Sequence, residues 1–329
     1  MSFLAPKERT YLFHALDPLH VGTGGTRIGR VDNLVARDPA TRLPKIPGSG
    51  LSGAIKDAYD LFTLADPDSK RINKTQRCAG SRGCGKDNCP VCALFGTAPS
   101  EDGGPSINAR RGIVAFRDAL LAAMPVASLK GPCWLVTIDL ALRLRLITDK
   151  QATDLAGTEN IAASKSLRVS GQMVNVGGYL LDCPENLTIK PENITIEALS
   201  KSLNFFPKTF PVASFVDLVK RMVVCDGPVF QALCASALEV RTSVTIDPYT
   251  GAAEPKKLFT LEAVPTGTFF ETRLDFLGGK LAGYYSECKD SDSLFSIIET
   301  RGFPYLEISG IGGNVTRGFG RIRFFSYWQ

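Results

Sequence analysis

Hydrophobic and polar positions along the first fifth of the chain predict a strand, a loop and a helix in succession. Residues 9–16 are rich in aromatic and aliphatic side chains, as expected of a strand. A polar, glycine-rich loop follows at 19–48. Beyond it, apolar residues recur every three or four positions, which is the period of one helix face. The residues on that face are Leu51, Ala54, Ile55, Ala58 and Phe62.

The rest of the chain shows strand and helix patterns around two long irregular stretches. Strands are predicted at 112–124, 133–147, 238–246, 257–264 and 268–277, and helices within 196–206, 212–224, 229–238 and 291–301. The stretch 66–111 is polar and rich in glycine and proline, which predicts an exposed insertion. The stretch 149–191 has little helical period, and Ser170-Gly171 marks the turn of a predicted hairpin at 163–182. Together the elements predict an α+β fold, with an antiparallel sheet and helices on one face.

Composition adds the class of protein but little about its partners. With 329 residues, of which 44% are hydrophobic, the chain can bury a sizeable core. No apolar run reaches the roughly 20 residues of a membrane helix, and the first residues lack a secretory signal, so we expect a cytoplasmic protein with no membrane partner. The net charge of +5 is mild. Local clusters of charge are therefore more informative than the total.

A basic, flexible loop precedes the first helix. It contains Gly22 and Gly24, and its cations outnumber its acids, a combination that suits a polyphosphate backbone. Ser49 is the predicted N-cap of the helix, whose first-turn N–H groups would form an anion site. The loop lacks the Gly-Lys-Ser/Thr of a P-loop and the spacing of a dinucleotide fingerprint. An ordinary mobile surface loop remains the alternative.

Four cysteines lie close together in the polar insertion. They are Cys78, Cys84, Cys89 and Cys92. A tetrahedral zinc ion takes four thiolates, and the last two cysteines have chelating spacing. We expect structural zinc, since cysteines in a polar loop have no core to fill; reduced surface thiols or a redox pair are the alternatives. A closed site of four thiolates leaves no open position for catalysis.

The order of motifs in the N-terminal region resembles the RAMP superfamily of CRISPR proteins. His20, the glycine-rich loop, Asp32, Arg37-Asp38 and the Pro-Gly-Ser before the helix follow one another as in that family. Within it, the chain is most similar to the backbone subunits of type III effector complexes. The segment Pro-Val-Ala-Ser-Leu-Lys-Gly at 125–131 favours the type III-B (Cmr) subunit, with the type III-A (Csm) subunit second. The cysteine insertion is closer to the Csm type.

The resemblance implies a fold and a set of partners. It implies one RAMP domain over 1–329 with a ferredoxin-like (RRM-like) core, a zinc insertion at 66–111 and a thumb-like hairpin insertion at 149–191. Such subunits bind guide CRISPR RNA, tile along it head to tail with copies of themselves and other type III subunits, and cleave complementary target RNA at regular intervals. The thumb would splay base pairs of the guide–target duplex.

The resemblance also assigns roles to residues. Asp32 would support cleavage by Mg²⁺ or a similar divalent ion, with His20 and Glu239 possible assistants. RNA contacts are expected at Gly22, Gly24, Arg27, Arg30, Lys45, Ser49, Lys56, Lys130, Arg168, Met173 and Arg317. Two other interpretations stay open. In one, the protein tiles RNA without cutting it and Asp32 is only a turn residue; in the other, it is an unrelated zinc-containing enzyme.

Overall fold

One large mixed sheet organises the structure. The computed structural model describes residues 3–24, 31–66, 77–79, 83–86, 88–97, 110–190, 203–205, 212–280, 285, 288 and 290–327. The sheet has the order β13 (Thr188–Ile189), β9 (Ile161–Ser164), β15 (Met222–Cys225), β8 (Cys133–Thr137), β7 (Ala119–Val126), β18 (Phe269–Phe276), β2 (Lys7–Ala15), β20 (Ile322–Tyr327) and β14 (Leu203–Phe205). Short β3 (Lys45–Ile46) pairs with β7, and β6 (Val114–Phe116) with β18. The predicted α+β class is confirmed.

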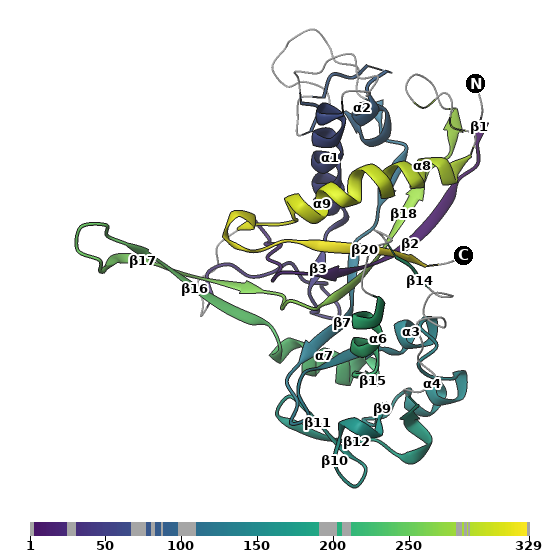
Figure 1. The fold of residues 1–329 in the computed structure, drawn as a ribbon, viewed down its shortest axis with the longest axis vertical. Coiled ribbons are helices and arrows are strands. Elements are labelled where there is room, and N and C mark those ends of the chain that lie inside the picture. Colours follow the sequence, from purple (N-terminus) through teal and green to yellow (C-terminus); the bar gives the residue numbers. More distant parts are fainter. Residues whose placement is uncertain are drawn as a thin grey trace.

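Four antiparallel strands of this sheet, in the order β7-β18-β2-β20, are covered on one face by helices (Figure 1). The chain passes from β2 through α1 (Gly48–Ala65) to β7, and from β18 through α8 (Ser291–Ile297) and α9 (Phe303–Ser309) to β20. Phe303 stacks on Phe324 of β20, with ring centroids 3.9 Å apart, and meets Tyr11 of β2 edge-on. The helix predicted at 291–301 continues further than expected, because the π-helical turn η5 (Ile298–Gly302) joins α8 to α9.

Helices also cover the opposite face, so the prediction of helices on one face is wrong. Because side chains alternate along a strand, Leu12 of β2 points to this second face, where it joins a separate hydrophobic cluster. Helices α3 (Ile138–Arg143) and α6 (Val212–Val219) complete that cluster. The strand predicted at 133–147 ends at Thr137, whose hydroxyl accepts a hydrogen bond from Leu140 N and caps α3. The helix predicted at 212–224 ends at Val219, and the apolar residues after it form buried β15.

The stretch 149–191 contains more structure than its pattern predicts. It includes α4 (Asp149–Leu155), η1 (Lys165–Leu167), β10 (Arg168–Ser170), β11 (Met173–Val176), β12 (Tyr179–Asp182) and η2 (Glu185–Leu187). The turn at Ser170-Gly171 is confirmed, with Gly171 at a φ of +55°. The hairpin is instead a three-stranded meander with a second turn at Gly177. Gly177 N donates to Ala127 O at 2.7 Å, so the meander packs against the body.

A long hairpin, β16 (Glu239–Ile246) and β17 (Ala253–Ala263), projects from the body (Figure 1). It follows α7 (Gly227–Ser236), and the predicted helix and strands of this region are confirmed. Apolar side chains on the hairpin face solvent, with Val240 56% and Leu258 64% exposed. At its base the hairpin is covered on both faces, since Leu261 and Ala263 pack on Phe319 and the intervening Glu262 is also buried.

The described end of the polar insertion packs on α1, so it is less exposed than predicted. Its elements are α2 (Pro90–Phe95), β4 (Gly96–Thr97) and β5 (Arg110–Arg111). At the far end of α8, β1 (Phe3–Leu4) pairs with β19 (Gly279–Lys280), and η6 (Val315–Arg317) precedes β20. The helix predicted at 196–206 falls mostly outside the described residues, and 203–205 form strand β14. Among the helices described, none is long and apolar enough to cross a bilayer.

Candidate functional site

Asp32 is held against the edge of β17. Its carboxylate Oδ2 accepts hydrogen bonds from Thr260 N at 2.7 Å and Thr260 Oγ1 at 3.0 Å. The next residue continues the attachment, since Asn33 N donates to Thr260 O and Glu262 N donates to Asn33 O. The hydrogen bonds from the backbone and hydroxyl of Thr260 lower the pKa of Asp32. Asp32 is therefore an oriented carboxylate that stays ionised at neutral pH.

Glu262 anchors the same loop two residues further along β17. This buried carboxylate accepts hydrogen bonds from Val35 N at 3.1 Å and from the Arg37 guanidinium at 2.5 Å. The sequence pattern did not predict Glu262 or Thr260 as part of the site. An acid among apolar strand residues needs a partner, so Glu262 within Leu-Glu-Ala-Val was a signal for a nearby cation. The identity of that cation, Arg37, depends on the tertiary structure.

His20 lies where the loop at 19–48 meets a second glycine-rich loop at 312–320. Its Nδ1 donates to the Glu262 carbonyl at 2.7 Å, and its own carbonyl accepts from Gly313 N at 2.8 Å. A Cβ on Gly312 would lie 2.4 Å from the His20 oxygen, so only glycine permits this approach. A Cβ on Gly22 would lie 3.0 Å from His20 Nε2. His20 thus fixes both loops against β17, which favours a positioning role.

Glu239 is not brought to Asp32. It pairs with Ala263 across the β16–β17 ladder, whereas Asn33 bridges Leu261 on the other edge of β17. Glu239 forms an ion pair at 2.6 Å with Arg241, whose guanidinium lies over Phe319. The strand β17 therefore separates the two acids that the resemblance placed together as candidates.

The start of α1 differs from the prediction. Pro47 precedes the helix, Ser49 lies exposed within its first turn, and no side chain caps it from the N-cap position. Instead, Asp118 Oδ1 accepts from Gly48 N at 2.8 Å, so the prediction of Ser49 as N-cap is wrong. Asp118 also pairs with Lys45 at 2.6 Å, and this pair lowers the pKa of Asp118 and raises that of Lys45. A carboxylate of the chain thus occupies the anion position expected there.

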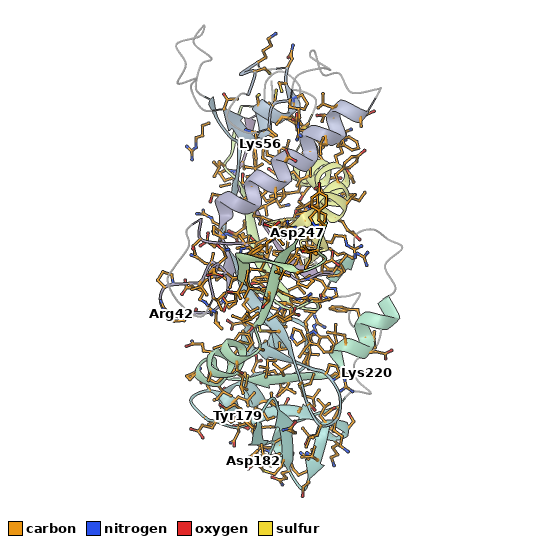
Figure 2. The ribbon with its side chains drawn as sticks, turned by 90° about the vertical axis from the view of Figure 1, so that its left-hand side faces the viewer. Arg42, Lys56, Tyr179, Asp182, Lys220 and Asp247 are labelled. Carbon is orange, nitrogen blue, oxygen red and sulfur yellow. The ribbon has the colours of Figure 1, made fainter. Side chains whose placement is uncertain are left out.

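The other candidate RNA contacts lie in different parts of the molecule. Gly22, Gly24 and exposed Arg317 lie near His20 or on the loops that meet there, whereas Arg27 and Arg30 lie outside the described residues. Lys130 and Met173 belong to the other end of the molecule, near Tyr179 and Asp182 in Figure 2. Lys56 lies towards the cysteine insertion and donates to Gly96 O. The structure therefore spreads the nine candidates that it describes over several surfaces rather than one.

Arg168, which was expected to contact RNA, is held by other residues of the chain. Its guanidinium donates to Glu185 at 2.9 Å, to the Cys183 carbonyl at 2.8 Å and to the Thr188 hydroxyl at 2.8 Å. Its side chain is only 10% exposed. These contacts join the end of β12 to β13, so the Arg168 guanidinium is engaged within the fold.

The four clustered cysteines converge on one point. Their sulfur atoms all lie within 4.8 Å of one another. The distances Cys78–Cys89 and Cys84–Cys92 are 3.6 and 3.7 Å, close to the roughly 3.8 Å that a tetrahedron with Zn–S bonds of about 2.3 Å requires. Hydrogen bonds from the Cys89 and Cys92 thiols lower the pKa of Cys78. The donor set fits zinc.

Asp60 of α1 supports this cluster from behind. The carboxylate is fully buried and accepts hydrogen bonds from Cys78 N at 2.9 Å and Ala79 N at 3.0 Å. The first cysteine is thereby tied to the helix that covers the main sheet, and such hydrogen bonds hold a metal ligand in its orientation. This contact joins the insertion to the core.

Comparisons with known proteins agree on one family. Residues 12–323 match the model of the RAMP superfamily. The chain is 25% identical over 94% of its length to the CRISPR system Cmr endoribonuclease Cmr4 of Pyrococcus furiosus, of which it covers 92%. A shorter match, 36% identical over 27% of the chain and 33% of the relative, is to the endoribonuclease Csm3 of Methanothermobacter thermautotrophicus. The fold is similar to a chain of the type III-B Cmr-beta complex bound to cognate target RNA, with a TM-score of 0.58, 18% identity and 98% of each chain covered.

Proposed function

The chain belongs to the RAMP superfamily, and we propose on that basis that it is a type III-B backbone subunit that binds guide RNA and cleaves complementary target RNA at regular intervals. The similarity to the endoribonuclease Cmr4 over nearly the whole chain supports this proposal most directly. The order β7-β18-β2-β20, with α1 and α8–α9 as crossovers, supports a ferredoxin-like core. Two glycine-rich loops that meet at His20 support an RNA backbone site.

Asp32 is the residue that we assign to cleavage. Its lowered pKa makes it a weak general base but a good ligand or orienting group, because it stays ionised. One carboxylate together with RNA phosphate oxygens is a donor set that Mg²⁺ accepts, and the ion would neutralise charge that develops on the phosphate. Thr260 holds one carboxylate oxygen, which sets the direction of the other. Attack by the adjacent 2′-hydroxyl then depends on how the bound backbone is positioned.

The partners follow from the same proposal. Copies of the subunit would lie head to tail along one guide, with zinc holding the 66–111 insertion and other type III subunits completing the complex. The three-stranded meander within 149–191 is the proposed thumb. The hairpin β16–β17 is a second candidate, because it projects further and carries exposed apolar side chains.

A non-cleaving RNA scaffold is the second candidate function. The observation that favours it is the Asp32–Thr260 contact, since a purely structural turn residue would make the same hydrogen bonds. The isosteric change Asp32→Asn separates the two functions. The amide oxygen still accepts from Thr260, so the loop keeps its place while the charge is lost.

The test is cleavage by an assembled complex with its guide and a labelled complementary RNA. Asp32→Asn should abolish periodic cutting and leave guide and target binding unchanged. Asp38→Asn is the matched control, because among the described residues Asp38 accepts hydrogen bonds from its own turn, from Ala40 N and Thr41. Cutting by Asp32→Asn at the wild-type rate would leave the scaffold as the better function. Cleavage that persists in the presence of a chelator would exclude a divalent ion from the proposed mechanism.

A further inference from the structure

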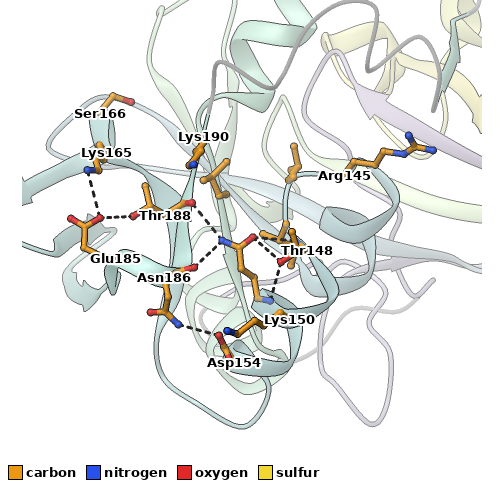
Figure 3. Close-up of a pocket in the computed structure, with 14 residues that line it drawn as sticks. Arg145, Thr148, Lys150, Asp154, Lys165, Ser166, Glu185, Asn186, Thr188 and Lys190 are labelled. Atoms are coloured by element: carbon orange, nitrogen blue, oxygen red, sulfur yellow. Dashed lines mark hydrogen bonds and ion pairs between the residues drawn. The ribbon is translucent and has the colours of Figure 1, made fainter.

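A pocket of about 1000 Å³ is lined by residues between 145 and 190 and by none of the residues that contact Asp32 (Figure 3). It lies between α4 and the segment that runs from η2 into β13. Figure 3 shows Arg145 on one side and Lys165 with Ser166 on the opposite side. Neither the proposed RNA contacts of the glycine-rich loops nor the zinc cluster lines it. The pocket is therefore a separate feature of the chain.

The walls of the pocket are fixed by hydrogen bonds. Thr148 and Gln151 form a reciprocal capping box at the start of α4. The Gln151 amide nitrogen also donates to the carbonyl of Asn186 at 3.0 Å, which ties α4 to the opposite wall. Beneath these groups, Leu146, Ile147 and Ile189 line the floor and belong to the hydrophobic cluster under the sheet. The result is an apolar floor within a polar rim, as in many ligand sites.

Positive charge dominates the rim. Its two acids are engaged: Glu185 pairs with Arg168 at 2.9 Å and Lys165 at 3.6 Å, and Asp154 accepts from Asn186 at 3.0 Å. The other cations on the rim, Arg145, Lys150 and Lys190, are exposed and form no ion pair with any residue that the structure describes. A negatively charged ligand would form ion pairs with these three cations.

Arg145 adds backbone strain at the rim. Its φ of +57° lies in the left-handed region, which a long side chain seldom adopts. The conformation lets Leu146 N donate to Ala141 O at 2.8 Å and turns the chain from α3 into the floor of the pocket. Strained residues of this kind concentrate at ligand sites, where the surroundings hold them in place.

We propose that this pocket binds a nucleoside monophosphate, with the phosphate at the cations of the rim and one face of the base on the apolar floor. The source of that group is either a free nucleotide or the phosphorylated 5′ end of an RNA strand. The site uses other residues than those assigned to guide binding and cleavage. Its test is therefore independent of the test of the proposed function.

Calorimetric titration of the full-length protein with AMP, adenosine and inorganic phosphate tests the pocket. AMP should bind, and adenosine and phosphate alone should each bind at least about tenfold more weakly, because each lacks one half of the contacts. Changing Arg145, Lys150 and Lys190 to Gln should weaken AMP binding by about tenfold or more. The matched control keeps the charges, with Arg145→Lys, Lys150→Arg and Lys190→Arg, and should bind AMP nearly as the parent does.

No AMP binding by the parent, or equal binding by the neutralised variant, would overturn the proposal. If the triple variant does not fold, Lys190→Gln alone, at an exposed position, gives the same comparison. Competition with a short RNA then assigns the source. Displacement of AMP by a 5′-phosphorylated RNA but not by its 5′-hydroxyl form identifies an RNA end, and displacement by neither identifies a free nucleotide.

Discussion

His14 makes the stability of this protein depend on pH in a way that one substitution can remove. The imidazole lies in β2 and stacks on Phe269, with ring centroids 4.4 Å apart. Both ring nitrogens are buried without a hydrogen-bond partner among the described residues. Burial, and after it the charge of Arg323 on the adjacent strand, lowers the pKa of His14 from 6.5 to about 4. The folded protein thus holds a neutral imidazole.

The direction of the effect follows from proton uptake. Between pH 6.5 and about 4, the unfolded chain binds a proton at this histidine and the folded chain does not, so stability falls as the pH is lowered. At about 1.4 kcal/mol per unit of pKa shift, the full loss is about 3 kcal/mol near pH 4, and about 2 kcal/mol is already lost at pH 5. Above pH 7 the histidine contributes no pH dependence.

The measurement is urea unfolding of the parent and of His14→Phe from pH 4.5 to 8. Phenylalanine keeps the stack on Phe269 and has no group to protonate. The free energy of unfolding of the parent relative to the variant should be constant above pH 7 and should fall by about 2 kcal/mol at pH 5. Parallel pH profiles for the two proteins would refute the assignment of a buried neutral imidazole.

Three further outcomes are expected. Metal analysis should find one zinc per chain, and Cys89→Ser should lose it; zinc-free parent protein would contradict the cluster geometry. Neutralising the loop cations together should weaken guide binding and reduce its dependence on salt concentration, because fewer counterions are released. An unchanged salt dependence would mean that the loop does not contact the RNA backbone. The cations to neutralise are Arg27, Arg30 and Lys45. Thr260→Val should slow target cleavage without changing guide binding, and it should shift the acid limb of the pH profile of cleavage to higher pH, because Asp32 loses a hydrogen bond. Thr260→Ser keeps the hydroxyl and should restore both the rate and the profile. An unshifted profile for Thr260→Val would mean that Thr260 does not position Asp32.

Local residue patterns predicted most helices and strands. They failed where packing against distant segments determines the secondary structure. The apolar face of α1 and the strands β16, β17 and β18 follow directly from the periodicity of their residues. The run after Cys133 is apolar enough for a long strand, yet it turns into α3 at Thr137, because Leu140 and Ala141 have a second cluster to bury against. Periodicity cannot show that cluster, whose other members include Phe215 of α6 and Phe269 of β18.

The start of α1 shows the same limit in a polar contact. Ser49 has the residue type and position of a cap, but Asp118 from the turn before β7 takes the N–H of Gly48. Arg168 has the charge of an RNA contact, but the Glu185 carboxylate and two oxygen acceptors near it hold the guanidinium. Charge and propensity are properties of one residue, whereas the partner is a property of the fold.

The parts of the site that lie close together along the chain could be predicted from the residue pattern. These are the glycine-rich loop that contains Asp32 and the four clustered cysteines, the last two of them at chelating spacing. Which partner each of them has depends on how distant segments pack. Asp32 meets Thr260 across 228 positions of sequence, and β17 keeps Glu239 on its other edge. The reason is physical: a strand offers two edges and two faces, and which of them a distant loop occupies depends on the packing of the whole sheet.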